Sequence, residues 1–160
     1  MIHRAAKLSR CGTYRYTLTR RWADCGTTCL FVLLNPSTAD ALRDDPTIRR
    51  CIAFAQAWGH AEMIVVNLFA LRATAPRVLK AHARPIGPRN TATLRQHAAA
   101  ADLIVIAWGQ HGTHRNRHRT VLKLLQPFDK KVHCLGRTKE GHPRHPLYIA
   151  AKQPLQHAPL

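Results

Sequence analysis

Four short apolar runs, separated by stretches with helical periodicity, limit the possible folds of this chain more than any other feature. The runs are Cys29–Leu34, Met63–Val66, Leu103–Ala107 and Lys131–Leu135. Continuous apolar runs of this length are typical of strands that are covered on both faces, and alternation with helices is typical of parallel sheets. The pattern predicts a three-layer α/β/α fold around a short, mainly parallel four-stranded sheet.

The stretches between these runs carry signals that begin and end helices. Asp45 can cap a helix that has Pro46 in its first turn, and Gly59 can end that helix. We predict further helices over residues 75–81, 91–101 and 115–126. Each predicted helix follows one apolar run and precedes the next, as crossover connections require.

The N-terminal part adds one more strand to this prediction. Residues Thr13–Leu18 alternate between polar and apolar side chains. We expect this strand to pair antiparallel with Cys29–Leu34 through a turn near Asp24–Gly26. A single α/β domain should therefore span residues 1–160, with a frayed tail after about Ala151.

Two absences in the sequence suggest where the protein resides. No apolar run approaches the length that spans a bilayer, and the N-terminus lacks the apolar core of a signal peptide. The expected location is the cytoplasm. The five cysteines should be reduced there, and the spacing of Cys25 and Cys29 has no second close pair to complete a metal site. We predict neither a metal nor a cofactor.

The charge balance points to a polyanionic partner. Lys and Arg total 25 against 8 Asp and Glu, which gives a formal net charge of +17. Such an excess attracts phosphate backbones, whose counterions are released on binding. A genomic bias toward Arg and Ala codons is the alternative explanation. We expect nucleic acid as the partner, DNA rather than RNA, and neither a membrane nor an obligate protein partner.

Polar residues follow the first predicted strand of the parallel sheet, where ligand sites of such sheets lie. Three of the eight acids fall between positions 40 and 45, directly after the string LNPSTA at 34–39. Asn35 could orient a water molecule or contact a base edge, and Asp40 or Asp44 could act as a base or stabilise a developing cation. A turn at Asn35 and a helix cap at Asp45 explain the same string, and we favour the cap for Asp45.

Two later segments offer further polar groups. Asn67 ends an apolar strand, and its amide matches the edge of a nucleobase; a turn-forming side chain bonded to the backbone is an equal alternative. The loop over residues 138–148 contains two His-Pro pairs, His142-Pro143 and His145-Pro146. This loop could bind phosphates and place an imidazole beside an anion, or it could be a rigid structural loop.

These strings resemble two groups of proteins. LNPSTAD (34–40), DPTI (45–48), NLFALRA (67–73), WG (108–109) and HPLY (145–148) are similar to an uncharacterised bacterial and phage family, the domain of unknown function 1643, over nearly the full length. The order of the strand-end motifs also resembles the uracil-DNA glycosylase superfamily, which has a short parallel sheet between two helical layers. Ser37 departs from that pattern, because a Gly follows the Asn-Pro pair in the mismatch-specific branch.

The second resemblance implies roles for individual residues. The implied catalytic residues are Asn35, Asp40, Asp44 and His145, with His142 as an alternative register for the last. The implied substrate-binding residues are Pro36, Ser37, Asn67, Phe69, Trp108 and Gly109. The implied nucleic-acid contacts are Arg137, Lys139, His142, Arg144 and Leu147.

Three functions fit these residues. The first is a glycosylase-like hydrolase that cleaves the N-glycosidic bond of a flipped base. The second is another nucleotide or nucleoside enzyme that uses the same strand-end pocket, and the third is a non-catalytic nucleic-acid-binding module. The acidic cluster argues against a pure binder because it would repel phosphate, and the net charge of +17 argues against a small-molecule enzyme.

Overall fold

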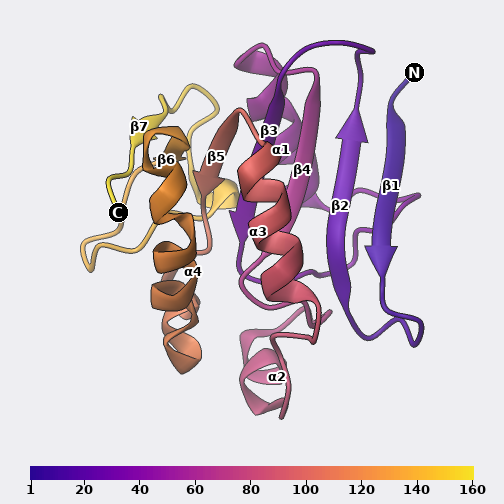
Figure 1. Cartoon of the computed structure of the whole chain (residues 1–160), viewed down its shortest axis with the longest axis vertical. Coiled ribbons are helices and arrows are strands. Elements are labelled where there is room, and N and C mark those ends of the chain that lie inside the picture. Colours follow the sequence, from indigo (N-terminus) through magenta and orange to yellow (C-terminus); the bar gives the residue numbers. More distant parts are fainter.

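Seven strands form one mixed sheet in the computed structural model, which describes residues 1–160 (Figure 1). They are β1 (His3–Leu8), β2 (Arg15–Arg21), β3 (Thr28–Leu33), β4 (Glu62–Asn67), β5 (Leu103–Ile106), β6 (Val132–Cys134) and β7 (Gln156–His157). Their order across the sheet is β1-β2-β4-β3-β5-β6-β7. The chain therefore has an α/β fold, with a larger sheet than the sequence predicts.

The centre of the sheet is built from the four apolar runs. Neighbouring strands in the series β4, β3, β5 and β6 pair parallel, with Phe31 opposite both Val65 and Val105. All three of these side chains are completely buried. The apolar runs are continuous because helices cover the central strands on both faces.

The N-terminal pairing differs from our prediction. β2 pairs antiparallel with β1 and β4, and it does not pair with β3. Both edges of β3 are already occupied by β4 and β5, so the predicted hairpin between β2 and β3 has no free edge to form on. The expected frayed tail is also wrong, because β7 pairs antiparallel with β6 and Ala158 is completely buried.

Four α-helices connect and cover the strands. They are α1 (Pro46–Ala57), α2 (Pro76–Ala81), α3 (Asn90–Ala100) and α4 (Arg117–Leu125). Segments of 3-10 helix follow β5, α4 and the loop after β6; they are η1 (Gln110–Asn116), η2 (Gln126–Lys131) and η3 (Pro146–Tyr148). None of the helices has the length and apolar character that crossing a bilayer requires.

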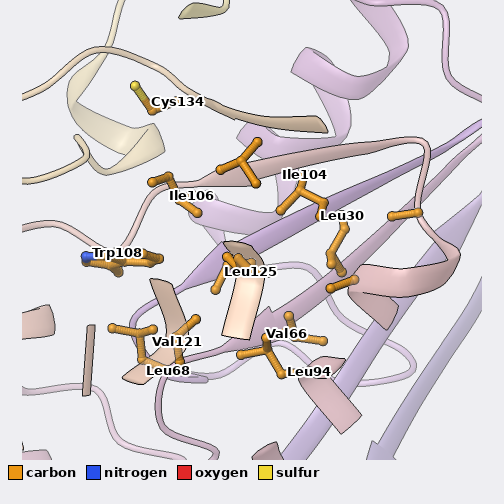
Figure 2. Close-up of a cluster of buried hydrophobic side chains, with 14 of the residues drawn as sticks. Leu30, Val66, Leu68, Leu94, Ile104, Ile106, Trp108, Val121, Leu125 and Cys134 are labelled. Carbon is orange, nitrogen blue, oxygen red and sulfur yellow. The ribbon is translucent and has the colours of Figure 1, made fainter. Parts of the chain in front are cut away.

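The core has two halves, one on each face of the sheet. On one face, α3 and α4 lie side by side, and their Leu94 and Val121 join Leu30 and Val66 from the strands (Figure 2). On the other face, α1 packs against the alternate strand side chains through Ile48, Cys51, Phe54 and Ala55. Adjacent strand residues thus enter different halves of the core, as the two-residue repeat of a strand requires.

Candidate active site

A cavity of about 650 Å³ opens at the edge of the sheet where the parallel strands end. Its wall combines Asn35 after β3, Trp108 and Gly109 after β5, and Arg144 and His145 after β6. The first turn of α1, residues 45–48, also lines it. Strand-end loops that are far apart in the sequence therefore meet at one site, in the position where open α/β sheets bind ligands.

The Asn35 amide is held so that only its oxygen is free. Its Nδ2 donates to the carbonyl oxygens of Pro36, Leu71 and Ala73, at 2.9, 3.3 and 2.8 Å. These acceptors fix the amide orientation, because a flipped amide would place its oxygen against the same carbonyls. The Oδ1 accepts no hydrogen bond from the protein, so Asn35 presents one acceptor on a side chain that lines the cavity.

Asp45 has two roles at the N-terminus of α1. Its Oδ1 accepts from the Ile48 N–H at 2.9 Å, which confirms the predicted helix cap, and its Oδ2 accepts from the Ala39 N–H at 3.3 Å. Pro46 occupies the first turn, as predicted. The Asp45 carboxylate also lines the cavity, a position that our sequence analysis did not assign to it.

His145 contributes a neutral imidazole with a defined tautomer. Its Nδ1 accepts from the Leu147 N–H at 3.3 Å and caps the short helix η3, which leaves the proton on Nε2. Burial lowers the pKa of His145 below its ordinary value, and the Asp45 carboxylate opposes that effect. The Nε2–H has no acceptor in the protein, so the cavity wall carries an uncharged donor.

One backbone hydrogen bond joins the loops after β5 and β6, and another closes the loop after β6 on itself. The Gly109 N–H donates to the Pro143 carbonyl at 2.8 Å, and the Arg144 N–H donates to the Gly136 carbonyl at 3.0 Å. Gly109 has a φ of 72°, and a Cβ placed on it would lie 3.9 Å from the His145 Cβ. The His145 side chain is thus fixed beside the end of β5.

Trp108 forms part of both the core and the cavity. Its indole is 3% exposed and lies at the margin of the core, with its nitrogen directed away from the labelled aliphatic side chains (Figure 2). Gly112 packs against it so closely that a Cβ there would lie 2.3 Å from the Trp108 Cδ1. Phe69, the other aromatic candidate, is completely buried in the core, packs near His114 and does not line the cavity.

Asp40 and Asp44 lie outside this cavity. The Asp40 Oδ1 accepts from the backbone N–H groups of Leu42 and Arg43, and these bonds hold the pKa of that carboxyl below its usual value. Asp44 forms ion pairs with Arg20 at 2.8 Å and Arg4 at 2.6 Å. The acidic cluster of the sequence therefore separates into a turn, a partly buried ion-pair network and the cap of α1.

Asn67 is buried beside the cavity without lining it. It is 1% exposed, and neither its Oδ1 nor its Nδ2 has a hydrogen-bond partner. In the parallel pairing it lies opposite Leu33, so both side chains point to the α1 face of the sheet. Leu33 lines the cavity, which places Asn67 one side chain away from it.

The remaining candidates divide between the cavity and its surroundings. Ser37, Arg144 and Leu147 line the cavity, whereas Pro36, Arg137, Lys139 and His142 do not. Arg137 and Lys139 are exposed on the same loop, and Arg137 donates to the Gly141 carbonyl. The exposed Tyr148, which the sequence analysis did not single out, also lines the cavity and lies 5.6 Å from the His145 ring.

Arg15 is the main functional candidate that sequence reasoning missed. It lines the cavity although it is only 2% exposed, and its one side-chain hydrogen bond goes to the Ala39 carbonyl at 2.6 Å. Its Nε is buried without a partner, and no carboxylate forms an ion pair with it. Arg15 begins β2, whose antiparallel pairing with β4 brings the start of β2 to the edge where β4 ends.

The structure contains no group of three or more His, Cys, Asp or Glu side chains that could hold a metal ion.

Residues 15–147 match the model of a family described as "Protein of unknown function (DUF1643)". This range runs from Arg15 to Leu147 and contains every cavity-lining residue except Tyr148. Neither the curated proteins nor the solved structures contain a match to the chain.

Proposed function

The chain belongs to the DUF1643 family of proteins of unknown function, and we propose that it hydrolyses the N-glycosidic bond of a base that is flipped out of DNA. One observation carries the proposal. Asn35 and His145 line the same cavity, the first with a free amide oxygen and the second with a free, uncharged N–H. An acceptor for a water molecule and a donor for a departing anion are the two groups that such a hydrolysis needs.

Asn35 would hold the water. Its Oδ1 can accept one hydrogen of the water and turn an oxygen lone pair toward C1′ of the sugar, because its Nδ2 is committed to backbone carbonyls. The water oxygen forms the new bond to C1′ while the electron pair of the C1′–N bond leaves with the base. The proton released from the water passes to solvent, and the base anion is protonated after it departs.

His145 would stabilise the departing base. A neutral imidazole donates a hydrogen bond to the negative charge that develops on the base without giving up its proton. Burial lowers the pKa of His145, which keeps the ring uncharged near neutral pH. The bond from the Leu147 N–H keeps the imidazole in the tautomer that presents Nε2–H.

Asp45 replaces Asp40 and Asp44 in this proposal as the group that stabilises the cationic sugar. The sugar becomes oxocarbenium-like as the base leaves, and a carboxylate nearby lowers the energy of that state. Asp45 is the only acid that lines the cavity. Its fixed position as a helix cap holds the carboxylate in place before the substrate arrives.

The cavity rim and the charge of the whole chain favour a nucleic acid as the substrate. Arg144, Leu147 and Tyr148 line the cavity and are exposed to solvent, and Tyr148 is 74% exposed. An exposed aromatic ring can stack on a base, and exposed guanidinium groups contact phosphates. Arg137 and Lys139 extend this basic rim along the same loop.

The resemblance of the strand-end motifs to the uracil-DNA glycosylase superfamily also supports the proposal. The motifs that resemble that superfamily follow β3, β4, β5 and β6 in the same order. We propose that the four parallel strands correspond to its short parallel sheet, with helices on both faces. The three strands paired antiparallel would then be additions at the two margins.

The proposal is tested with labelled oligonucleotides that carry uracil, mismatched, oxidised or bulky modified bases. After incubation with the protein, alkali converts any abasic site into a strand break. We expect breaks with at least one substrate. We expect about a hundredfold slower cleavage for Asn35→Ala and for His145→Asn, which keeps a capping acceptor for the Leu147 N–H but lacks the imidazole donor.

His142→Asn is the matched control, because His142 also precedes a proline in this loop but does not line the cavity. It should cleave like the wild type. Equal loss in His142→Asn and His145→Asn would show that loop damage, not the imidazole, explains the result. Salt-sensitive DNA binding without a break on any substrate would instead favour the non-catalytic binding module.

A further inference from the structure

The most unusual group in the cavity is the guanidinium of Arg15. A buried charge is costly unless it is paired, and this one donates a single hydrogen bond, to the Ala39 carbonyl. Burial lowers the pKa of Arg15 to about 10, and the Asp45 carboxylate opposes that effect. Arg15 is therefore still protonated at neutral pH, with N–H donors that no protein atom accepts.

The other buried arginines show how this fold normally treats such a group. Arg20 donates to Asp44 and to several carbonyl oxygens, and Arg117 donates to the Leu68 carbonyl and the Thr91 hydroxyl. Neither lines the cavity. Arg15 alone combines burial, spare donors and a position in the cavity wall, which is what a binding residue needs.

The neighbours of Arg15 restrict what its spare donors can bind. The same wall carries the Asp45 carboxylate and the free oxygen of Asn35, both of which are acceptors. A phosphate would bring only acceptors and negative charge against them. A neutral ligand that turns two acceptors toward Arg15 adds no negative charge beside these groups.

We propose that Arg15 is the base-reading residue and that the base is a purine of the guanine type, including modified guanines. Guanine is neutral and presents two adjacent acceptors, O6 and N7, which match the arginine fork. This inference rests on the proposed function only for the statement that the ligand is a base. It assigns to Arg15 the reading role that the sequence pattern suggested for Asn67, which does not line the cavity.

The test is a binding measurement that does not depend on turnover. Labelling the protein with ¹⁵N makes the Arg15 Nε–H observable, and the signal is assigned by its loss in Arg15→Lys. The probes are 2′-deoxyguanosine, 2′-deoxy-7-deazaguanosine (which lacks the N7 acceptor), 2′-deoxyadenosine, thymidine and inorganic phosphate. We expect deoxyguanosine to shift the Arg15 signal and to bind about tenfold more tightly than the other nucleosides.

Arg15→Lys keeps the charge and one donor for the Ala39 carbonyl but cannot form the paired contact. It should abolish the preference for deoxyguanosine over its 7-deaza analogue. Arg117→Lys is the matched control, because Arg117 is 4% exposed and lies away from the cavity. This variant should retain the preference, and thermal unfolding of both variants checks that they are folded.

Several results would overturn the inference. The first two are binding of the 7-deaza analogue as tightly as deoxyguanosine and binding of thymidine more tightly than deoxyguanosine. The others are no binding of any nucleoside, and a shift of the Arg15 signal by phosphate that competes with deoxyguanosine. The two proposals fail separately. Arg15-dependent binding of deoxyguanosine without base excision would refute only the hydrolase, whereas excision of uracil that is indifferent to Arg15→Lys would refute only the base assignment.

Discussion

Hydrogen bonds to the backbone decide which polar side chains of this protein are free to act on a ligand. One oxygen of Asp40, Oδ1, accepts from two backbone N–H groups, and both oxygens of Asp44 are occupied by arginines. Asn35 has the opposite arrangement, because its donors are occupied and its acceptor is free. Residue type alone does not distinguish these cases, since each side chain offers both kinds of contact or several oxygens.

Asp44 should therefore contribute to stability. The Arg20 side chain is completely buried, and removing its carboxylate partner leaves an uncompensated charge. We expect Asp44→Ala to lower the free energy of unfolding by about 3 kcal/mol in urea titrations. Activity per folded molecule should not change. If Asp44→Ala were as stable as the wild type but had no turnover, Asp44 would have a catalytic role and not a structural one.

His145 should impose an acid limit on activity. Burial places its folded-state pKa below the unfolded value near 6.5, so any stability that depends on the neutral ring is lost as the pH falls through the folded pKa. Protonation also removes the Nδ1 acceptor for the Leu147 N–H. We expect turnover to be constant above about pH 7 and to fall below about pH 6.5. An imidazole ¹⁵N titration of His145 should show the same midpoint, and a midpoint above 6.5 would contradict the neutral-donor role.

At the scale of elements, α1 links the stability of the fold to the site. Its first turn lines the cavity, and its N-cap is the same carboxylate that we propose stabilises the sugar cation. A helix cap needs only an acceptor, whereas stabilising a cation needs the negative charge. The two roles of Asp45 can therefore be separated by substitution.

Asp45→Ala should destabilise the protein by about 1 kcal/mol, because the Ile48 N–H loses its acceptor. Asp45→Asn keeps the cap, so its unfolding in urea should stay close to that of the wild type while base excision slows at least tenfold. Normal turnover in Asp45→Asn would show that the carboxylate serves only as a cap.

The sequence predicts the elements of the fold better than it predicts their pairing. The helix α1 and the strands β3, β4, β5 and β6 lie where the periodicity places them, because burial on both faces leaves a continuous apolar pattern. β1 is half polar, β7 consists of two polar residues, and both lie at the margins of the sheet, so their side chains carry no such pattern. Which strands become neighbours depends on which strand edges are free in the folded sheet. The residues of β2 do not indicate that both edges of β3 are already paired.

The candidate site was predictable to the extent that it follows the parallel strands. Asn35, Trp108, Gly109, Arg144 and His145 all line the cavity, and all of them come after an apolar run. The rule that ligands lie beyond the carboxyl ends of parallel strands does not reach Arg15, which begins an antiparallel strand. Its entry into the site depends on the pairing of β2 with β4, whereas we predicted from the sequence that this strand pairs with β3.

At the scale of the whole molecule, the net charge of +17 dominates the approach of any ligand. If exposed basic residues contact phosphates, DNA binding must release counterions, and the logarithm of the binding constant should fall linearly with the logarithm of the salt concentration. We expect a steep slope in fluorescence-anisotropy titrations with a labelled duplex. A binding constant that is the same at low and moderate salt would contradict the prediction that the protein contacts DNA phosphates.

The backbone bonds that hold the loop after β6, one of them to Gly109 at the end of β5, have a consequence for the time course of binding. Because the loop that carries His145 is already fixed, the cost of ordering it is met during folding. Encounter with a ligand should then show a single kinetic phase whose rate rises in proportion to ligand concentration. With DNA as the ligand, any slower phase would come from the nucleic acid, which must unstack a base, and not from a change in the protein.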